Sequence, residues 1–288
     1  MIKKISLVTI IGILFFTAIL AIDSEKIISS KYRIYSYLSK NYIATEILNF
    51  KMFLQPGDEM ITPYMLAFHH WEPLETTLIY NSLKEGDTFV DVGANLGYYT
   101  ILAAKKIGNK GHVYAFEPEP NNFELLRMNI ILNKLSNVSI FQKAVADKSG
   151  KMTLYLNHKN KGDHSLRKDI QEKDSILVDV ISLDEFLNNK TIDLIKIDVQ
   201  GADGLVLNGS KNIISKNKGL IIFTEFNPFS FRNLNSDPIK ILTNLKTLGY
   251  KFSNLDEKNG KVTPMSINEI LKNFDKPGIE TNLMMLPN

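Results

Sequence analysis

The stretch Phe89-Val90-Asp91-Val92-Gly93-Ala94-Asn95-Leu96-Gly97-Tyr98-Tyr99-Thr100 decides the fold of this chain. An apolar run ends in Asp91 and in a turn bracketed by Gly93 and Gly97, and a helix-compatible segment follows from Tyr98 to Lys106. In α/β proteins, a strand, a glycine turn and a helix in this order bring backbone N–H groups and a helix N-terminus against a nucleotide-like ligand. The stretch therefore predicts an α/β fold with a ligand site at this turn.

A second acidic residue supports a nucleoside site. Glu117 lies 26 residues after Asp91 and ends the apolar run from His112 to Phe116. A carboxylate in that place can accept hydrogen bonds from both hydroxyls of a ribose. Because Asp91 can meet an ammonium and Gly93 permits close backbone approach, a ligand with a ribose and a charged amino-acid tail fits this pattern. The alternative is that Asp91 only caps the turn and the glycines only serve its geometry.

Segments of strand and helix character alternate from about residue 60 onward, which predicts a mostly parallel sheet. We expect strands at 88–92, 112–117, 138–142, 192–198 and 219–225, with an additional strand pair at 151–156 and 176–181. We expect helices at 72–84, 97–107, 120–134, 182–188, 203–216 and 238–248. The polar segment 157–175 is predicted to be a surface loop, and Asn227-Pro228 the start of another. His69 and His70 are expected in a helix that packs over the site.

The composition of the chain excludes several functional classes. The 288 residues, 44% of them hydrophobic, allow one large domain or one domain with appendages. With no cysteine, the chain has no disulfide, thiolate metal site or cysteine nucleophile, and its five histidines form no metal-binding pattern. The net charge is +3, and no basic cluster is interleaved with aromatic residues, so we expect neither a metal nor a nucleic-acid partner.

The N-terminus contains the clearest break in composition. Lys3 and Lys4 precede an uncharged run from Ile5 to Ile22, which as a helix would span roughly 27 Å, close to the roughly 30 Å of a bilayer core. We expect an uncleaved membrane anchor within residues 1–22, with a cleaved signal peptide as the alternative. Residues 23–59 are predicted to form a helical connector. The basic residues after the run favour a domain that faces the cytoplasm.

An ordered set of segments between roughly residues 70 and 250 matches a known pattern. The segments are Trp71-Glu72-Pro73, Asp91 to Thr100, Val113 to Pro118, Asn122 to Leu126, Ala144 to Asp147, His164-Ser165-Leu166, Ser182 to Glu185, Ile192 to Val199 and Thr224-Glu225-Phe226. In this order they resemble the FkbM family of S-adenosylmethionine-dependent methyltransferases. The resemblance implies a class I methyltransferase fold, a Rossmann-like and mostly parallel sheet with helices on both faces and the cofactor at the carboxyl ends of the strands. It also implies methyl transfer to oxygen, often a hydroxyl of a sugar.

The resemblance implies seven residues around S-adenosyl-L-methionine, namely Asp91, Gly93, Asn95, Gly97, Glu117, Ala144 and Val145. Glu117 would hold the ribose hydroxyls, and the backbone of Ala144 and Val145 would lie beside the adenine. The other four would surround the methionine part.

Three residues are candidates for the transfer itself. Asp198 ends the predicted fourth strand beside the expected sulfonium, and we expect it to act as a general base or to orient the acceptor. Its alternative role is to cap the next helix or to support the cofactor. Glu225, at the end of the predicted fifth strand, is a second candidate acid. His164 would contact the acceptor or take its proton, because an unperturbed histidine titrates near pH 6.5, and its alternative is an ordinary surface residue.

One position departs from the family pattern. The family usually carries Asp-Val-Glu-Gly-Ala-Glu, whereas this chain has Asp198-Val199-Gln200-Gly201-Ala202-Asp203. Gln200 keeps the size and the hydrogen-bonding reach of glutamate but loses its charge. If the family's carboxylate binds a metal or orients the acceptor, this replacement changes activity or acceptor choice.

The leading hypothesis is a membrane-tethered O-methyltransferase, with residues 60–288 as its domain, that acts on a glycan, a glycolipid or a related small molecule. One alternative is a non-catalytic module of the same fold that binds the cofactor or a glycan. The other is a nicotinamide-dependent oxidoreductase, against which the missing third glycine of G-x-G-x-x-G counts. The sequence indicates no oligomeric state.

Overall fold

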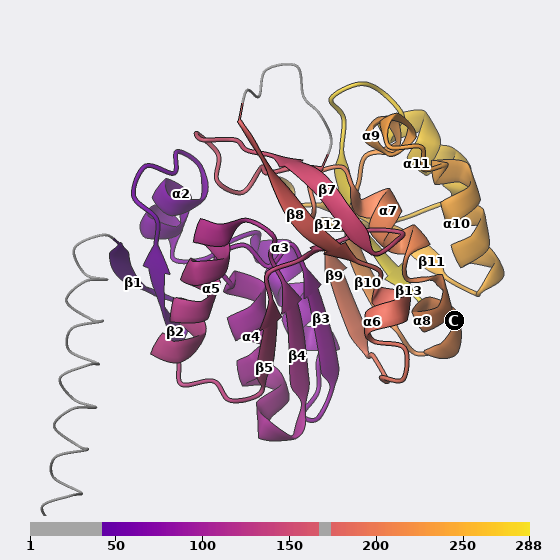
Figure 1. Cartoon of the computed structure of the whole chain (residues 1–288). Helices are drawn as coiled ribbons and strands as arrows, with labels where there is room; N and C mark the ends of the chain where they lie inside the picture. Colours follow the sequence, from indigo (N-terminus) through magenta and orange to yellow (C-terminus); the bar gives the residue numbers. More distant parts are fainter. Residues whose placement is uncertain (1–41, 167–173) are drawn as a thin grey trace, which may run out of the picture. The chain divides into compact units, whose positions relative to one another are not determined.

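The computed structural model describes residues 42–166 and 174–288 (Figure 1). The chain divides into two units, Met1–Ala44 and Thr45–Asn288. The predicted anchor at residues 5–22 and the connector up to residue 41 lie outside the described residues. Within the described ranges, no helix combines the length and the apolar character needed to cross a bilayer.

An eight-stranded sheet forms the centre of the second unit, in the order β12-β11-β13-β10-β9-β3-β4-β5. Its strands are β3 (Thr88–Val92), β4 (His112–Phe116), β5 (Val138–Phe141), β9 (Leu194–Ile197), β10 (Ile221–Phe226), β11 (Lys251–Asp256), β12 (Lys261–Met265) and β13 (Thr281–Leu286). The five strands from β10 to β5 pair in parallel, whereas β13 runs antiparallel to both β10 and β11. The predicted Rossmann-like class is confirmed, and the sheet, predicted to be mostly parallel, is mixed.

The strand order fixes the position of the ligand site. The chain proceeds from β3 outward through β4 to β5, then returns to β9 on the other side of β3 and proceeds outward to β10. The strand order therefore reverses between β3 and β9, and such a switch point is where open α/β sheets bind ligands. All five parallel strands present their carboxyl ends at this edge.

Helices cover both faces of the sheet, as Figure 1 shows. Right-handed crossovers place α4 (Tyr98–Ile107) and α5 (Pro120–Leu132) on one face, because these connect strands that proceed in one direction from β3. They place α7 (Asp203–Asn208), α8 (Lys211–Lys216) and α10 (Pro238–Thr247) on the other. The remaining helices are α2 (Ile61–Phe68), α3 (Pro73–Ser82), the 3₁₀ turn η1 (Gly108–Lys110), α6 (Leu183–Phe186), α9 (Pro228–Asn233) and α11 (Ile267–Phe274).

The single helix predicted at 203–216 is wrong, because Gly209 separates α7 from α8. A Cβ at Gly209 would lie 2.1 Å from the carbonyl oxygen of Ala146, so the helix backbone approaches β6 too closely for any larger residue. The Gly209 carbonyl also accepts hydrogen bonds from Asp184 N–H and from the hydroxyl of Ser182. The break therefore results from a tertiary contact and not from helix propensity.

A small second sheet extends the domain over the edge that carries the strand ends. It consists of β6 (Ala144–Val145), β7 (Gly150–Tyr155) and β8 (Ser175–Ile181), in the order β6-β8-β7. The predicted pair at 151–156 and 176–181 is confirmed as β7 and β8, and β6 is an addition. The described part of the predicted surface loop returns to β7 through a bridge between Tyr155 and Ser165.

The predicted helical connector is wrong in its described part. Residues Ile43–Ile47 form β1 and Phe50–Leu54 form β2, which pair as a two-stranded sheet. The strand β2 packs against α5, where the buried amide of Asn129 accepts a hydrogen bond from Phe53 N–H and donates one to the Phe53 carbonyl. Because Met52 and Phe53 are buried in the core, the folded unit begins before the predicted boundary at residue 60.

Two further local predictions are wrong. The helix α2 ends at Phe68, because His69 has a φ of 59° in the left-handed region, so His69 and His70 follow the helix rather than lie in it. Asn227 starts a helix rather than a loop. Its side chain accepts a hydrogen bond from Ser230 N–H, which caps the first turn of α9 after Pro228.

Candidate functional site

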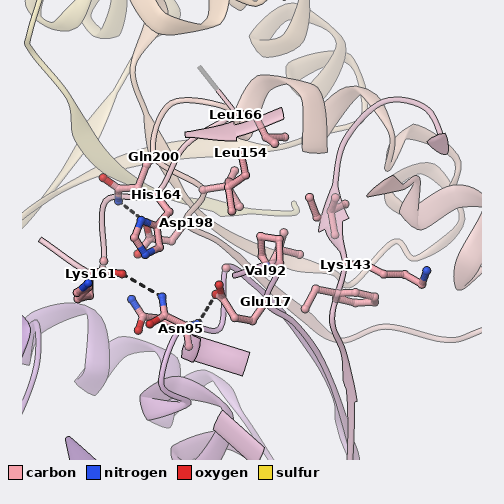
Figure 2. Close-up of a pocket in the computed structure, with 18 residues that line it drawn as sticks. Val92, Asn95, Glu117, Lys143, Leu154, Lys161, His164, Leu166, Asp198 and Gln200 are labelled. Carbon is pink, nitrogen blue, oxygen red and sulfur yellow. Dashed lines mark hydrogen bonds between the residues drawn. The ribbon is translucent and has the colours of Figure 1, made fainter. Parts of the chain in front are cut away.

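A cavity lies at the carboxyl ends of β3, β4 and β9 (Figure 2). Its walls comprise Val92, Gly93, Asn95, Phe116, Glu117, Pro118, Asn122, Lys143, Ala144, Val145, Leu154, Lys161, Gly162, His164, Leu166, Asp198, Val199 and Gln200. We call it the cofactor cavity. Its volume is about 40 Å³, and Gly162 and His164 lie on its wall.

The glycine turn brings the backbone to the wall of this cavity. The N–H groups of Gly93 and Ala94 both donate to the Phe116 carbonyl, which fixes the turn against the end of β4. Gly93 has a φ of 85°, and a Cβ there would lie 1.9 Å from the carbonyl oxygen of Asp198. Gly93 is therefore required both by its backbone conformation and by the close approach of β9.

Glu117 supplies the carboxylate of the cofactor cavity. Its two oxygens accept hydrogen bonds from Asn95 N–H at 2.8 Å and from Glu119 N–H at 2.9 Å, and Figure 2 shows the first of these. Burial raises the pKa of Glu117 to about 8, although both backbone hydrogen bonds favour the ionised form. A carboxylate offers about four acceptor positions, so this group keeps two for the hydroxyls of a ribose.

Two of the seven residues expected around the cofactor lie behind the cavity wall. Asp91 is 1% exposed and accepts a hydrogen bond from the Thr100 hydroxyl at 2.6 Å. Its burial raises the pKa to about 6, against the opposing effect of Lys196. A Cβ at Gly97 would lie 2.7 Å from Leu126 Cδ1, so that glycine serves the packing of α4 on α5. The structure brings together Gly93, Asn95, Glu117, Ala144 and Val145, but neither Asp91 nor Gly97 lines the cavity.

A second cavity, of about 160 Å³, adjoins the first and shares Asn95, Gly162, Asp198 and Gln200 with it. Its other walls are Met60, Ile61, Met65, Trp71, Glu72, Ala94, Leu96, Tyr98, Tyr99, Asn160, Glu225 and Asn282. We call it the acceptor cavity. It combines an aromatic and apolar side with carboxyl and amide groups, the usual lining of a site for a polar small molecule.

Asp198 lies where the two cavities meet. Its Oδ2 accepts a hydrogen bond from Lys196 Nζ at 2.9 Å, and its Oδ1 accepts one from Gln200 Nε2 at 2.8 Å. Burial alone would raise the pKa of Asp198, but Lys196 and then Gln200 outweigh it and hold that pKa below its usual range. Asp198 is therefore ionised, and it is better suited to hold a hydroxyl than to keep that hydroxyl's proton.

The departure at Gln200 has a visible structural consequence. Gln200 has a φ of 53°, and its carbonyl accepts a hydrogen bond from the Ser165 hydroxyl at 2.7 Å. Asp203 supports the same turn by accepting from the N–H groups of Val199 and Gly201. A glutamate at position 200 could not donate to Asp198 when ionised, so the amide orients the Asp198 carboxylate.

His164 lies on the wall of the cofactor cavity and not on that of the acceptor cavity. Its Nδ1 accepts a hydrogen bond from Asn157 N–H at 3.0 Å, so the neutral ring carries its proton on Nε2. Burial lowers the pKa of His164 to about 4. This arrangement favours donation of a hydrogen bond to a ligand over removal of a proton.

Glu225 and Glu72 complete the acidic side of the acceptor cavity. Glu225 follows from the sequence as a candidate, and the structure places it at the end of β10, on this wall. The position of Glu72 on this wall does not follow from the sequence. The segment Trp71-Glu72-Pro73 offers only an acidic residue directly before a proline as a local sign of a special role. Among the described residues, no group of three or more histidine and acidic side chains is arranged to hold a metal ion.

Comparison with known proteins identifies a family for this part of the chain. The model of the methyltransferase FkbM domain matches residues 91–252, more than half of the chain. Methyltransferase 1 of Beauveria bassiana is 32% identical over 146 residues, which cover 43% of this chain and 58% of that protein. The 31-O-demethyl-FK506 methyltransferase FkbM of Streptomyces tacrolimicus is 38% identical over 76 residues, which cover 25% of this chain and 28% of that protein.

A third relative, the 2-O-methyltransferase NoeI of Sinorhizobium fredii, is 26% identical over 164 residues, covering 50% of this chain and 64% of that protein. The chain thus spans less than two thirds of the length of each of these three relatives. Among solved structures, methyltransferase FkbM from Methylobacillus flagellatus KT is similar with a TM-score of 0.44 and 16% identity, covering 70% of this chain and 44% of that one.

Proposed function

The chain belongs to the methyltransferase FkbM domain family, whose methyl donor is S-adenosyl-L-methionine, and on this premise we propose that it methylates a hydroxyl oxygen of a glycan, a glycolipid or a related small molecule. Two relatives are named as O-methyltransferases, which supports oxygen as the accepting atom. The observation that carries the proposal is the junction of the two cavities at Asp198, which gives a nucleoside cofactor and an acceptor adjoining places.

The donor set of the cofactor cavity fits S-adenosylmethionine. Glu117 would hold the ribose hydroxyls, the backbone of Ala144 and Val145 would lie beside the adenine, and the absence of a Cβ at Gly93 lets the Asp198 backbone close the wall of the cavity. When bound, the cofactor supplies an electrophilic methyl group on a sulfonium sulfur. The negative charge of Asp198 at the junction favours a cation there.

The residues of the chain mainly position the acceptor. The ionised Asp198 accepts a hydrogen bond from the hydroxyl to be methylated, while Lys196 and Gln200 fix the two carboxylate oxygens. The proton that the hydroxyl loses would pass along this hydrogen bond to Asp198 and from its partly exposed side chain to solvent. Holding the attacking oxygen in one orientation is the main contribution available to such a site. Trp71 also lines the acceptor cavity, and we propose that a sugar ring of the acceptor stacks on its aromatic side chain.

Binding by the full-length protein, measured by calorimetry, tests this proposal. We expect S-adenosylmethionine to bind, and Glu117→Ala to weaken binding about 100-fold or more, because two hydrogen bonds to a charged group are lost. Glu124→Ala, which removes an exposed acid paired with Arg127, is the matched control and should bind like the wild type. A preference for a nicotinamide dinucleotide would support the oxidoreductase instead. Cofactor binding without transfer to any hydroxyl would support a binding module.

We further propose that residues 5–22 anchor the protein in a membrane and that the domain faces the cytoplasm. The proposal rests on the uncharged run and on the basic residues after it. Treatment of intact cells with a protease should leave the domain uncut, and cleavage from outside would contradict the orientation.

A further inference from the structure

The wall of the acceptor cavity carries more acidic groups than the transfer reaction requires. Besides Asp198, the carboxyl groups of Glu72 and Glu225 line the cavity, whereas neither of them lines the cofactor cavity. No lysine or arginine is among the described residues on its wall. The two extra acids therefore face the acceptor and not the cofactor.

Glu225 is the more informative of the two. It is 9% exposed, and within the described ranges its Oε2 has no hydrogen-bond partner. Burial, and next the negative charges of Asp203, Asp198 and Glu280 together with a side-chain contact to Glu280, raise the pKa of Glu225 well above its usual range. A buried carboxyl oxygen without a partner is unfavourable, so its place on the cavity wall points to a partner that arrives with a ligand.

Glu72 has a conformation that costs free energy and directs its side chain to the same cavity. Its φ of 38° and ψ of 72° are unusual, since a residue before proline normally has an extended backbone. It stands at the N-cap position of α3 but does not cap the helix, because Glu257 accepts the N–H groups of Leu74 and Glu75 instead. One oxygen of Glu72 accepts a hydrogen bond from the Tyr99 hydroxyl at 2.8 Å.

The lysine nearest to these acids cannot balance their charge. Lys196 is 3% exposed, and its Nζ lies 2.9 Å from Asp198 Oδ2 and 3.9 Å from Glu75 Oε1, with the Tyr99 ring centroid at 4.5 Å. Its single positive charge acts first on Asp198 and Glu75, and then on Glu72 and Asp91. In the described part of the chain, Lys196 forms ion pairs with Asp198 and Glu75 but not with Glu72 or Glu225.

Given the proposed function, we infer that the acceptor carries a protonated amino group beside the hydroxyl that is methylated, and that Glu72 and Glu225 bind this amine. An ammonium group donates three hydrogen bonds, and its positive charge favours ionisation of the two carboxyl groups whose pKa values burial raises. A neutral sugar satisfies the hydrogen bonds but not the charge. A uronic acid or a phosphate is repelled.

The test is methyl transfer from methyl-labelled S-adenosylmethionine by the full-length protein to an extract of its source organism. One half of the extract is first N-acetylated with acetic anhydride, which removes the positive charge of amines. We expect a labelled product that binds a cation exchanger, and at least about a tenfold loss of labelling in the acetylated half. Mass-spectrometric fragmentation should place the methyl on oxygen.

The outcomes separate this inference from the proposed function. A labelled product that is neutral or anionic, or labelling that survives acetylation, would overturn the inference while O-methylation stands. A methyl on nitrogen would refute the proposed O-methylation, and the inference with it. Absence of any labelled product with a cofactor-binding protein would refute the proposed function, and the inference with it.

Variants then tie the amine to the two carboxyl groups. At low extract concentration, Glu225→Gln should lower labelling about 30-fold or more, because a buried charge partner is lost. Glu85→Gln, which removes an exposed acid paired with Lys110, should label like the wild type. Both variants should bind S-adenosylmethionine normally, which shows that they fold. Equal labelling by Glu225→Gln and Glu85→Gln would show that Glu225 does not bind the amine.

Discussion

Replacing Gly93 by alanine should separate the ends of β3 and β9 and damage stability and cofactor binding together. The added Cβ would lie 1.9 Å from the carbonyl oxygen of Asp198, and real Cβ contacts essentially never fall below 3.0 Å, so the two segments must move apart by at least about 1.1 Å. That movement strains the hydrogen bond from Asp198 N–H to the Val92 carbonyl at 2.9 Å. It also shifts the carboxylate at the junction of the two cavities.

The magnitude follows from two terms. An alanine at a φ of 85° costs about 1–2 kcal/mol, and forcing an extra carbon into a packed contact costs about 1–3 kcal/mol. The sum of about 2–5 kcal/mol corresponds to a fall in Tm of roughly 4–20 °C for a domain of this size. S-adenosylmethionine affinity should fall as well, because the same turn forms the cavity wall.

Thermal unfolding followed by circular dichroism and calorimetric titration with the cofactor measure these effects. Gly219→Ala is the matched control, because a Cβ there meets no atom within 4 Å and its φ is not in the left-handed region. The control should differ from wild type by no more than about 1 kcal/mol. Equal Tm values and equal affinities for the two variants would refute the close approach of the Gly93 turn to β9.

Three further predictions concern ionisation and buried polar groups. The pKa of the Glu117 carboxyl is about 8, and this group must be ionised to accept hydrogen bonds from both ribose hydroxyls. Cofactor binding should therefore tighten about tenfold from pH 7 to pH 9 in the wild type, and less so in Glu117→Gln. Calorimetric affinities that change with pH in the same way in both proteins would contradict this. Asn129→Ala leaves buried backbone groups of β2 and of the glycine turn without partners and should lower the free energy of unfolding by about 2–5 kcal/mol, measured with denaturant. The control Asn244→Ala removes an exposed side chain and should change that free energy by less than about 0.5 kcal/mol. Lys196→Met leaves the Asp198 carboxylate without its cation and should destabilise the protein by about 3–5 kcal/mol near neutral pH. The loss of stability should be smaller in acid, where the Asp198 carboxyl is protonated. A loss that does not depend on pH would indicate that Lys196 contributes by packing alone.

The sequence predicted those strands whose apolar pattern can be recognised within a few neighbouring residues. The strands β3, β4, β5, β9 and β10 lie on short apolar runs, and those of β3, β4 and β9 are followed directly by a glycine or an acid. The elements that were missed include β11, β12 and β13, whose polar or short apolar runs gain their strand conformation from pairing with β10 and with each other. Residues 43–54 of the predicted helical connector at 23–59 form strands instead, because β2 is held by hydrogen bonds to the amide of the distant Asn129.

The residues of the candidate site likewise include some whose position the sequence predicted and some whose position it did not predict. Gly93, Asn95 and Glu117 could be predicted because their roles depend on a turn and a strand end that are encoded within a few residues. Asp91 and Gly97 belong to the same pattern, yet side-chain packing against Thr100 and Leu126 places them behind the wall.

The sequence by itself determined the strand–turn–helix unit at 88–107, the acid at the end of β4 and the family, because backbone conformation and apolar periodicity are properties of neighbouring residues. Only the tertiary structure decided that Glu72, Asp198 and Glu225 share one cavity, and that Lys196 is already occupied by Asp198 and Glu75. These side chains come from separate segments, which only the order of strands in the sheet brings to one edge. Their charge balance exists only in the folded chain, because the sequence separation of these residues gives no sign of their proximity.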